Sequence, residues 1–240
     1  RKLISRLYGY HEKRACKKLD GIVSVTPIIC ERFSKFHPNV EMIANYPQIK
    51  LPEGQVSEKT HNHICYIGGL YESRGLREII LAIEHCDVVL HLAGSFDTEQ
   101  FEMELKQLKG WEKVVFYGQV NQAKITELLG ICSIGIVTLH PTPSYLEAYP
   151  IKMFEYMNSG LALLSSDFPL YRSLLDEIDC SEFVNPLEPN QISNTLRTML
   201  EDKQRLKEMG ARAKKAALLH YNWSKEKEKL YAFYDKLLYG

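Results

Sequence analysis

Between residues 63 and 219 the sequence alternates between short apolar or β-branched runs and longer amphipathic segments, and this alternation limits the fold more than any other feature. The short runs are typical of buried strands, and the segments between them have helical spacing. We expect strands at 63–67, 88–93, 114–117, 134–138, 161–165 and 182–184, with helices at 76–85, 99–108, 122–130, from 150 onward, and at 169–175, 189–200 and 203–219. Strands that alternate with helices form βαβ units, so we predict an α/β fold, with a parallel sheet covered by helices on both faces.

The residues on either side of this alternation are also organised. Residues 3–19 form a basic amphipathic segment, 20–26 a buried strand, 26–36 a capped helix and 40–44 another strand. Polar residues with Pro and Gly at 48–62 indicate a linker and a domain boundary. The last segment reads as a helix that packs through one side, which carries Trp223, Leu230, Phe233, Tyr234 and Leu237. We therefore divide the chain into residues 1–47, a linker at 48–62, a main domain at 63–220 and a C-terminal helix at 221–240.

The composition argues against several classes of protein. Lys+Arg and Asp+Glu are both 30, so the zero net charge gives no sign of a nucleic-acid partner. No apolar run approaches the ~20 residues of a membrane span, and no secretory signal is present. The six cysteines are widely spaced, so we expect reduced thiols and a cytoplasmic location. The basic segment leaves two alternatives open, which are peripheral contact with an anionic membrane and a solvated helix face.

The run from Glu147 to Gly160 holds two acids eight residues apart, with a cation between them. Pro150 is expected to start a helix, because its missing N–H is not needed in the first turn. Lys152 and Glu155 then share one side of that helix, while Glu147 lies in the loop before it. The free N–H groups of a helix start favour an anion, so the run predicts a site for a ligand with both hydroxyls and phosphates. Acids that merely complement the helix dipole are the plainer alternative.

Ligands of open parallel sheets bind outside the carboxyl ends of the strands, so the loops there are candidate sites. Gly68 and Gly69 let the backbone approach a ligand closely, and Arg74 can clamp a phosphate with its planar fork. The loop lacks the Gly-Lys-Ser/Thr ending of a nucleotide-triphosphate P-loop and the Gly-x-Gly-x-x-Gly spacing of dinucleotide sites. A simple turn followed by a helix cap is therefore an equal alternative.

Two further strand ends are candidates, and no metal site is convincing. Tyr117 with Gly118 could form a wall for a flat base, and Thr138 could offer a hydroxyl, although threonine at a strand end often reflects β-propensity alone. His61 and His63 have no carboxylate or cysteine partner nearby, so we expect them to face solvent. No Asp-x-Asp pair and no Gly-x-Ser-x-Gly elbow is present.

Together these segments resemble the retaining family 4 (group 1) glycosyltransferases of GT-B fold, over nearly the whole chain. The Glu-x7-Glu spacing of Glu147 and Glu155 matches the family motif, and the glycine loop with Arg74, the 114–120 strand and turn, and the 223–238 helix resemble other family segments. The resemblance implies two Rossmann-like domains. Residues 1–47 resemble the end of the N-terminal acceptor domain and the hinge, residues 63–220 the nucleotide-sugar donor-binding domain, and residues 221–240 the helix that crosses back.

The resemblance also implies roles for individual residues. Glu155 would hold the ribose hydroxyls, Glu147 would orient the donor sugar, and Arg74 and Lys152 would neutralise the diphosphate leaving group. Glu147, Arg74 and Lys152 would thus be catalytic, and the nucleotide would further contact Gly68, Gly69, Tyr117, Gly118, Thr138 and Ile151. The implied reaction is retaining and needs neither metal nor cofactor, since fixed cations and a helix start stabilise charge on the leaving phosphate.

We therefore predict a hexosyl- or related transferase that uses a nucleotide-diphosphate sugar and a glycan or lipid-linked acceptor in surface polysaccharide synthesis. The chain begins inside a helix at Arg1 and lacks most of an acceptor domain, so we expect a donor-binding piece that does not transfer sugar alone. A non-catalytic nucleotide- or partner-binding module of the same fold is the alternative, and the presence of both Glu147 and Lys152 favours the enzyme. A nucleotide-sugar epimerase matches the pattern less well.

Two departures from the family pattern matter, one in the glycine loop and one in the turn after Glu147. Gly68-Gly69 stands where many members have Gly-Arg, and Arg74 stands where Lys is commonest. The run 148–150, Ala-Tyr-Pro, replaces a frequent Gly-Phe-Gly and changes the shape of the sugar pocket. Base, sugar, acceptor, linkage and oligomeric state therefore stay open.

Overall fold

The computed structural model describes residues 2–49 and 59–240, and the chain divides into two units. The first unit consists of Arg1–Gln48 together with Asn222–Gly240, and the second is Ile49–Tyr221. Residues 50–58 of the predicted linker lie outside the described residues, and the domain boundaries placed from the sequence stay predictions.

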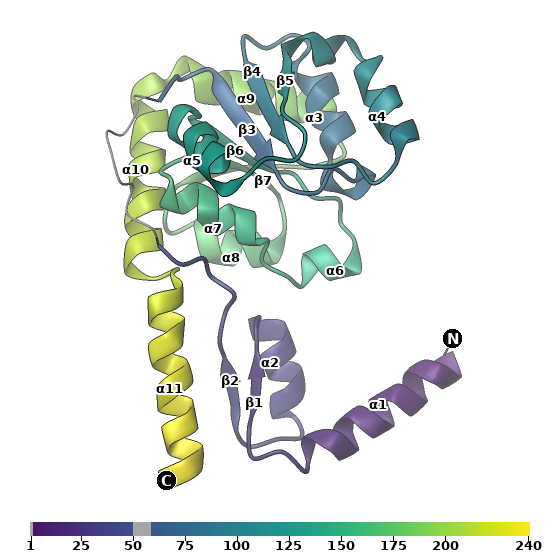
Figure 1. The fold of residues 1–240 in the computed structure, drawn as a ribbon, viewed down its shortest axis with the longest axis vertical. Helices are drawn as coiled ribbons and strands as arrows, with labels where there is room; N and C mark the ends of the chain where they lie inside the picture. Colours follow the sequence, from purple (N-terminus) through teal and green to yellow (C-terminus); the bar gives the residue numbers. More distant parts are fainter. Residues whose placement is uncertain (1, 50–58) are drawn as a thin grey trace. The chain divides into compact units, whose positions relative to one another are not determined.

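The second unit is built on a six-stranded sheet (Figure 1). Its strands are β3 (His63–Ile67), β4 (Val89–Ala93), β5 (Val114–Phe116), β6 (Ile134–Val137), β7 (Ala162–Ser166) and β8 (Ser181–Val184). They lie in the order β5-β4-β3-β6-β7-β8, and every neighbouring pair is parallel. The predicted parallel sheet is confirmed. The order is doubly wound: successive strands are added outward on one side of β3 and, from β6 onward, on its other side. The point between β3 and β6 is therefore the topological switch point, and the loops after these two strands flank the usual ligand crevice.

Helices cover both faces of this sheet, as predicted. They are α3 (Leu76–Ile83), α4 (Glu99–Lys106), α5 (Gln122–Ile131), α7 (Ile151–Asn158), α8 (Pro169–Leu175), α9 (Pro189–Glu201) and α10 (Lys203–Leu219). Helix α3 packs against α9, and α7 against α10. The sequence prediction missed three short helices, η1 (Glu72–Arg74), η2 (Lys109–Lys113) and α6 (Pro143–Leu146), because they are too short to show a hydrophobic period. Pro150 was predicted to be the first residue of the helix, but it is the N-cap of α7, which begins at Ile151.

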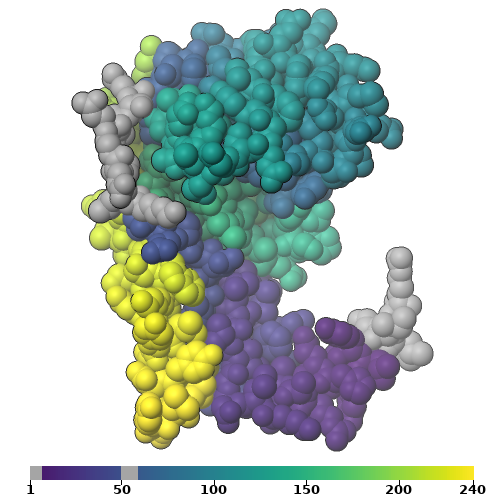
Figure 2. Space-filling model, viewed as in Figure 1, coloured from purple at the N-terminus to yellow at the C-terminus, as the bar shows by residue number. Residues whose placement is uncertain are grey.

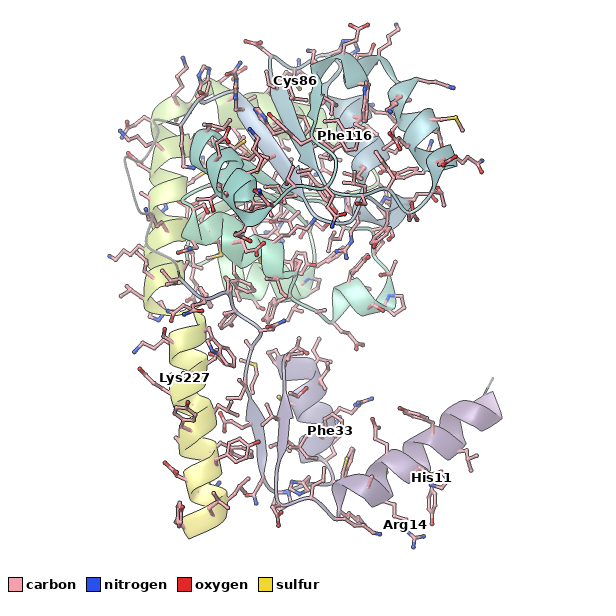
Figure 3. The ribbon with its side chains drawn as sticks, in the orientation of Figure 1. His11, Arg14, Phe33, Cys86, Phe116 and Lys227 are labelled. Atoms are coloured by element: carbon pink, nitrogen blue, oxygen red, sulfur yellow. The ribbon has the colours of Figure 1, made fainter. Side chains whose placement is uncertain are left out.

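The core lies mainly on the face of the sheet that α3 and α9 cover. Every second residue of the strands points to that face, because successive side chains of a strand point to opposite faces. Its fully buried members include Ile64, Tyr66, Leu76, Ile79, Leu90, Leu92, Ile134, Ile136, Leu164 and Ile192. The ring of Phe116, labelled in Figure 3, extends this core at the β5 edge, with its centroid 5.4 Å from that of Phe96 and 6.0 Å from that of Trp111. On the other face, the backbone N–H of Ile67 donates to the buried hydroxyl of Tyr156 at 2.8 Å, which fixes α7 beside the end of β3.

The first unit pairs two short parallel strands with three helices. These are α1 (Lys2–Cys16), β1 (Ile22–Ser24), α2 (Pro27–Ser34), β2 (Val40–Met42) and α11 (Trp223–Tyr239). The side chain of Thr26 caps α2 by accepting from the N–H of Ile29, as its Thr-Pro start predicts. Figure 2 shows α11, in yellow, along the purple segment of this unit. The buried Glu226 joins the two, because its Oε2 accepts from the N–H of Ala44 at 2.7 Å.

Two expectations for this unit are wrong. The strand at 20–26 is not buried throughout: Ile22 is buried, but Val23 is 43% exposed, because a two-stranded sheet packs only one of its faces. Tyr234 is 54% exposed, whereas its neighbour Phe233 is buried. Consecutive helical residues point about 100° apart, and of this pair only Phe233 points to the packed side.

Each of the six cysteines is a free thiol. Within residues 2–49 and 59–240, no helix has both the length and the apolar character that crossing a membrane requires.

Candidate donor site at the carboxyl edge of the sheet

The glycine loop after β3 lies directly over the sheet edge. The N–H of Gly68 donates to the carbonyl of Ala93 at 2.9 Å, and the hydroxyl of Tyr66 donates to the carbonyl of Gly69 at 2.9 Å. Gly68 has a φ of 137°, and a Cβ there would lie 3.1 Å from Nζ of Lys152. Only glycine therefore combines this backbone with room for the lysine.

Arg74 ends the short helix η1 and lies against the end of β6. The next residue, Gly75, has a φ of 73°, and a Cβ there would lie only 2.0 Å from the carbonyl oxygen of Thr138. The backbone N–H of His140 also donates to the carbonyl of Ser73 at 3.0 Å. These contacts join the loops after β3 and β6, on the two sides of the switch point.

The buried polar atoms of this contact region that have no hydrogen-bond partner include Nε of Arg74 and Oγ1 of Thr138, whereas the equally buried Nε2 of His140 lies 3.1 Å from Oε2 of Glu78. Thr138 is fully buried, so its hydroxyl lies inside the loop contact and not at an open strand tip. A buried donor without an acceptor costs folding free energy. In native structures such an atom often has a water molecule or a ligand as its partner.

Lys152 comes from the first turn of α7 and points back toward the glycine loop. Its Nζ lies 3.4 Å from the centroid of the Tyr66 ring, and it too is buried without a hydrogen-bond partner. Burial lowers the pKa of Lys152 well below its ordinary value, and the positive charge of Arg74 lowers it further, against smaller opposing effects of Cys65 and Glu155. Two cations are therefore held close together with no carboxylate paired to either among the described residues.

The two acids of the predicted motif have different surroundings. Glu155, half-buried on α7, has a raised pKa because burial disfavours its charge, and nearby Lys152 offsets part of that rise. Glu147 is exposed at the end of α6, in the loop before α7 as predicted. No hydrogen bond or ion pair in the described part of the chain ties the Glu147 side chain to the rest of the site. Ile151, the first residue of α7, is 42% exposed.

Tyr117, which directly follows β5 and is the expected wall for the base, is held by hydrogen bonds between side chains that the sequence did not predict. The Tyr117 hydroxyl lies 2.8 Å from Nδ1 of His91, and Nε2 of His91 lies 2.9 Å from Nδ1 of His63. His63 therefore pairs with His91 and does not simply face solvent, which corrects the expectation. Burial, with the proximity of His63, lowers the pKa of His91 to about 4, so its ring is neutral at neutral pH. Only the fold brings these residues together, since His63 lies on β3, His91 on β4 and Tyr117 just after β5.

Gly118 connects the end of β5 to the other loops at the carboxyl edge of the sheet. Its carbonyl accepts from the N–H of Gly94 at 2.8 Å, and a Cβ on Gly94 would lie 1.9 Å from the carbonyl oxygen of Gly68. The loops that carry Gly68, Arg74, Gly118 and Thr138 thus form one contiguous edge of the second unit.

Aromatic rings around the cations were also missed by the sequence prediction. The guanidinium carbon of Arg74 lies 4.6 Å from the ring centroid of Tyr145 and 5.9 Å from that of Tyr71. Tyr145 lies on α6, one of the helices too short to predict. The signal for that helix is the Thr142-Pro143 start, which has the same capping pattern as Thr26-Pro27.

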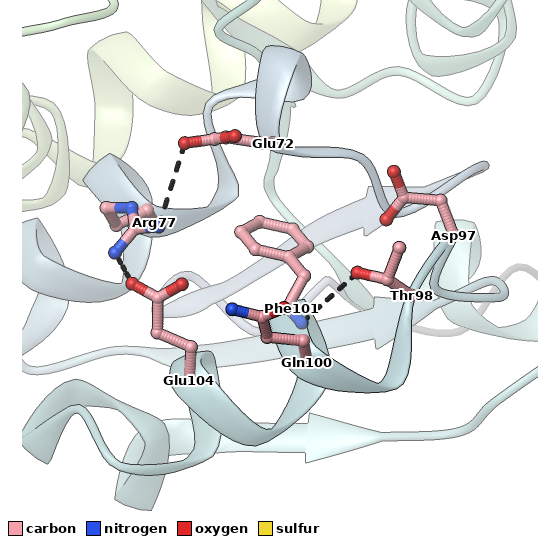
Figure 4. Close-up of a pocket in the computed structure, with 7 residues that line it drawn as sticks. All are labelled: Glu72, Arg77, Asp97, Thr98, Gln100, Phe101 and Glu104. Atoms are coloured by element: carbon pink, nitrogen blue, oxygen red, sulfur yellow. Dashed lines mark hydrogen bonds and ion pairs between the residues drawn. The ribbon is translucent and has the colours of Figure 1, made fainter.

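A separate hollow lies between η1, α3 and α4 (Figure 4). It is a pocket of about 290 Å³ lined by Glu72, Arg77, Asp97, Thr98, Gln100, Phe101 and Glu104. Arg77 already forms ion pairs with Glu104 and, at 3.7 Å, with Glu72. None of the predicted site residues lines this pocket, so its shape does not mark the donor site. No group of three or more metal-ligating side chains was found within the described ranges.

The chain matches one protein family and several solved structures. A family model described as glycosyl transferases group 1 matches residues 48–216. A variant of S. aureus TarM in complex with fondaparinux, alpha-GlcNAc-glycerol and UDP has a TM-score of 0.76 at 14% identity, covering 95% of this chain and 46% of that chain. HepE from Anabaena in complex with UDP-glucose has a TM-score of 0.73 at 16% identity, covering 90% and 64%.

A third structure is WaaG, described as a glycosyltransferase involved in lipopolysaccharide biosynthesis. Its TM-score is 0.65 at 17% identity, covering 91% of this chain and 62% of that chain. At such identities the similarity shows the fold alone. The chain spans between 46% and 64% of the length of these three proteins. No curated protein matches it in sequence.

Proposed function

The chain belongs to the group 1 glycosyl transferases, and from this premise we propose that its second unit binds a nucleotide-diphosphate sugar whose glycosyl group the whole protein transfers with retention of configuration. The fold agrees with the GT-B domains of the similar structures. Two of those proteins are described in complex with UDP or UDP-glucose, which supports the same class of donor here.

The observation that carries the proposal is the set of buried polar atoms without partners at the switch point. Arg74 Nε, Thr138 Oγ1 and Lys152 Nζ belong to three different elements, yet they lie around one contact between loops. A buried Lys152 ammonium beside the partly exposed Arg74, with no counter-ion for either among the described residues, is unfavourable, and a diphosphate would supply the missing acceptors and charge. The N-terminus of α7 adds the positive end of its dipole at the same place.

The same geometry suggests how these residues would act during transfer. Cleavage of the anomeric C–O bond places negative charge on the leaving phosphate, and preorganised cations stabilise that charge most in a site from which water is excluded. Arg74 and Lys152 have this role in the proposal. Glu155, three residues after Lys152 on α7, would accept hydrogen bonds from the ribose hydroxyls. Glu147, exposed just before that helix, would orient the sugar.

The remaining steps follow the family 4 pattern that the sequence resembles. The acceptor attacks the same face of the sugar that the phosphate leaves, and the departing phosphate takes the acceptor's proton, so this chain need not supply a general base. We propose a glycan or lipid-linked acceptor, a cytoplasmic location and a role in surface polysaccharide synthesis. The WaaG description supports this type of pathway.

Calorimetric titration with UDP, GDP and ADP, without and with magnesium, tests the donor site directly. We expect one nucleotide to bind without the metal. Failure of all three to bind would instead favour the non-catalytic reading, in which the fold serves as a partner-binding module.

Substitution of the two acids tests their roles. Glu155→Ala removes charge-assisted hydrogen bonds and should weaken nucleotide binding by about 1.5–3 kcal/mol. Glu147→Ala should leave nucleotide binding nearly unchanged and weaken only the binding of the nucleotide-sugar. The matched control is Glu201→Ala, an exposed acid at the end of α9. Equal losses of nucleotide affinity in the Glu155 and Glu147 variants would contradict the assignment.

A further inference from the structure

Arg74 forms no ion pair with a carboxylate of the residues that the structure describes. None of the ion pairs found among the described residues involves it, and its Nε is buried without a partner. Its guanidinium lies instead against aromatic rings, with Tyr145 at 4.6 Å and Tyr71 at 5.9 Å. Tyr71 is 40% exposed, so the nearer, half-buried Tyr145 is the stronger contact.

An aromatic ring is a better contact than a carboxylate for an arginine that must also bind a phosphate. A guanidinium stacks on an aromatic ring through its flat face, while it donates hydrogen bonds through its edge. A carboxylate partner would occupy the same edge that a phosphate needs. A tyrosine ring can therefore restrict the arginine without competing with the ligand.

Tyr145 is itself fixed from three directions. Its N–H donates to the carbonyl of Thr142, the N-cap of α6, at 3.0 Å, and its own carbonyl accepts from the Tyr171 hydroxyl on α8 at 3.4 Å. Its hydroxyl lies 3.4 Å from Oγ of Ser73, the residue before Arg74. The ring is thus attached both to the helix that precedes Glu147 and to the turn that carries the arginine.

From these contacts we propose that Tyr145 is a positioning residue of the donor site, whose ring holds the Arg74 guanidinium ready for the diphosphate and links it to Glu147 two residues further along. The inference rests on the proposed function, because it assigns the diphosphate to Arg74. Tyr145 acts through the arginine and need not touch the nucleotide.

A double-mutant cycle tests this role. The affinity for UDP, GDP, ADP and inorganic pyrophosphate is measured for Tyr145→Leu and Tyr145→Phe, each with Arg74 intact and in an Arg74→Ala background. With Arg74 present, we expect Tyr145→Leu to weaken binding about 3- to 10-fold, as loss of a partly desolvated cation–π contact would. Tyr145→Phe keeps the ring and should stay within about twofold. Without Arg74, Tyr145→Leu should have no further effect.

A second readout follows Arg74 in the free chain. Nitrogen-15 relaxation of its Nε–H should show an ordered side chain in the unmodified and Phe chains and a mobile one in the Leu chain. Tyr234→Leu, an exposed tyrosine on α11, controls for the loss of a tyrosine elsewhere. If Tyr145→Leu does not fold, as judged by its melting transition, Tyr145→Met takes its place.

The possible outcomes separate the two proposals. An equal loss with and without Arg74, a Phe variant as weak as the Leu variant, or an Arg74 side chain that stays ordered in the Leu variant would overturn the role of Tyr145 alone. If the unmodified chain binds none of the nucleotides or pyrophosphate, the proposed function fails and this inference fails with it.

Discussion

At the scale of single residues, the two cations of the donor site differ in what they can do. Arginine side chains are effectively always charged in proteins, so an arginine contributes to anion binding in a way that does not depend on pH. Lys152 can lose its proton, and its buried place beside Arg74 already lowers its pKa in the free chain. A bound diphosphate would favour the charged lysine and raise that pKa again. Binding of donor should therefore be linked to proton uptake at Lys152.

We accordingly expect nucleotide affinity to fall as the pH rises from the lowered pKa of free Lys152 toward the ordinary lysine value. Above that lowered pKa, each binding event must take a proton from solvent, which costs more free energy as the pH rises. Calorimetry in buffers of different ionisation enthalpy measures the uptake. The raised pKa of Glu155 adds a second titration, so the measurement is repeated in Glu155→Gln.

Lys152→Arg is the matched control, because arginine keeps its charge throughout this range. Its affinity should not change over the pH range in which that of the unmodified chain falls. Binding by the unmodified chain with no proton uptake at alkaline pH would show that Lys152 is already charged before the ligand arrives.

Whether a site residue could be predicted depends on how far away in the sequence its contact residues lie. Gly68, Arg74 and Lys152 could be predicted as candidates because each lies in a local pattern, either a strand–glycine turn or a helix start. The side chains that hold them could not, because Tyr145 is 71 residues from Arg74 and His91 is 28 from His63. No local pattern distinguishes such a ring or imidazole from ordinary core.

At the scale of elements, the periodic helices and the strands could be predicted because burial imposes their pattern on many residues. The short elements η1 and α6 were not predicted, because only a few hydrogen bonds define them. They nevertheless carry Arg74 and Tyr145. Burial of a strand was harder to predict than its existence. β1 has the composition of a core strand, but its only partner in the described chain is β2, so Val23 stays exposed.

Helix α11 depends on one buried carboxylate. Glu226 is fully buried, accepts from the N–H of Ala44 through Oε2, and contacts Nζ of Lys229 at 2.7 Å through Oε1. Glu226→Ala would leave a buried backbone N–H without an acceptor, and we expect a loss of about 1–3 kcal/mol in the stability of the first unit. Hydrogen exchange should accelerate in residues 40–47 and 222–239, while the sheet of the second unit keeps its protection.

Two further variants separate the hydrogen bond from the general effect of changing this helix. Glu226→Gln keeps an acceptor for Ala44 and should cost less than the alanine variant. Glu228→Ala changes an exposed acid on the same helix and should have little effect. Comparable acceleration in all three variants would mean that the buried carboxylate has no special role.

At the scale of the whole molecule, the sheet and the candidate site belong to the same unit. The hydrophobic core cluster lies entirely within residues 64–209, and the residues assigned to the donor, from Gly68 to Glu155, come from that range. The first unit has its own strand pair and its own helix contacts. A domain with its own core can in principle fold alone.

We therefore expect a fragment of residues 49–221 to fold cooperatively and to bind the same nucleotide as the whole chain, with a Kd within about twofold. The six-stranded sheet is complete in the fragment, and every cation, glycine and acid that we assign to the nucleotide is retained. Thermal unfolding followed by circular dichroism checks the fold, and calorimetry checks the binding. The Lys152→Met fragment, which should fold but bind weakly, shows that the heat measured comes from the donor site. A folded fragment that no longer binds nucleotide would contradict the assignment of the entire nucleotide site to the second unit.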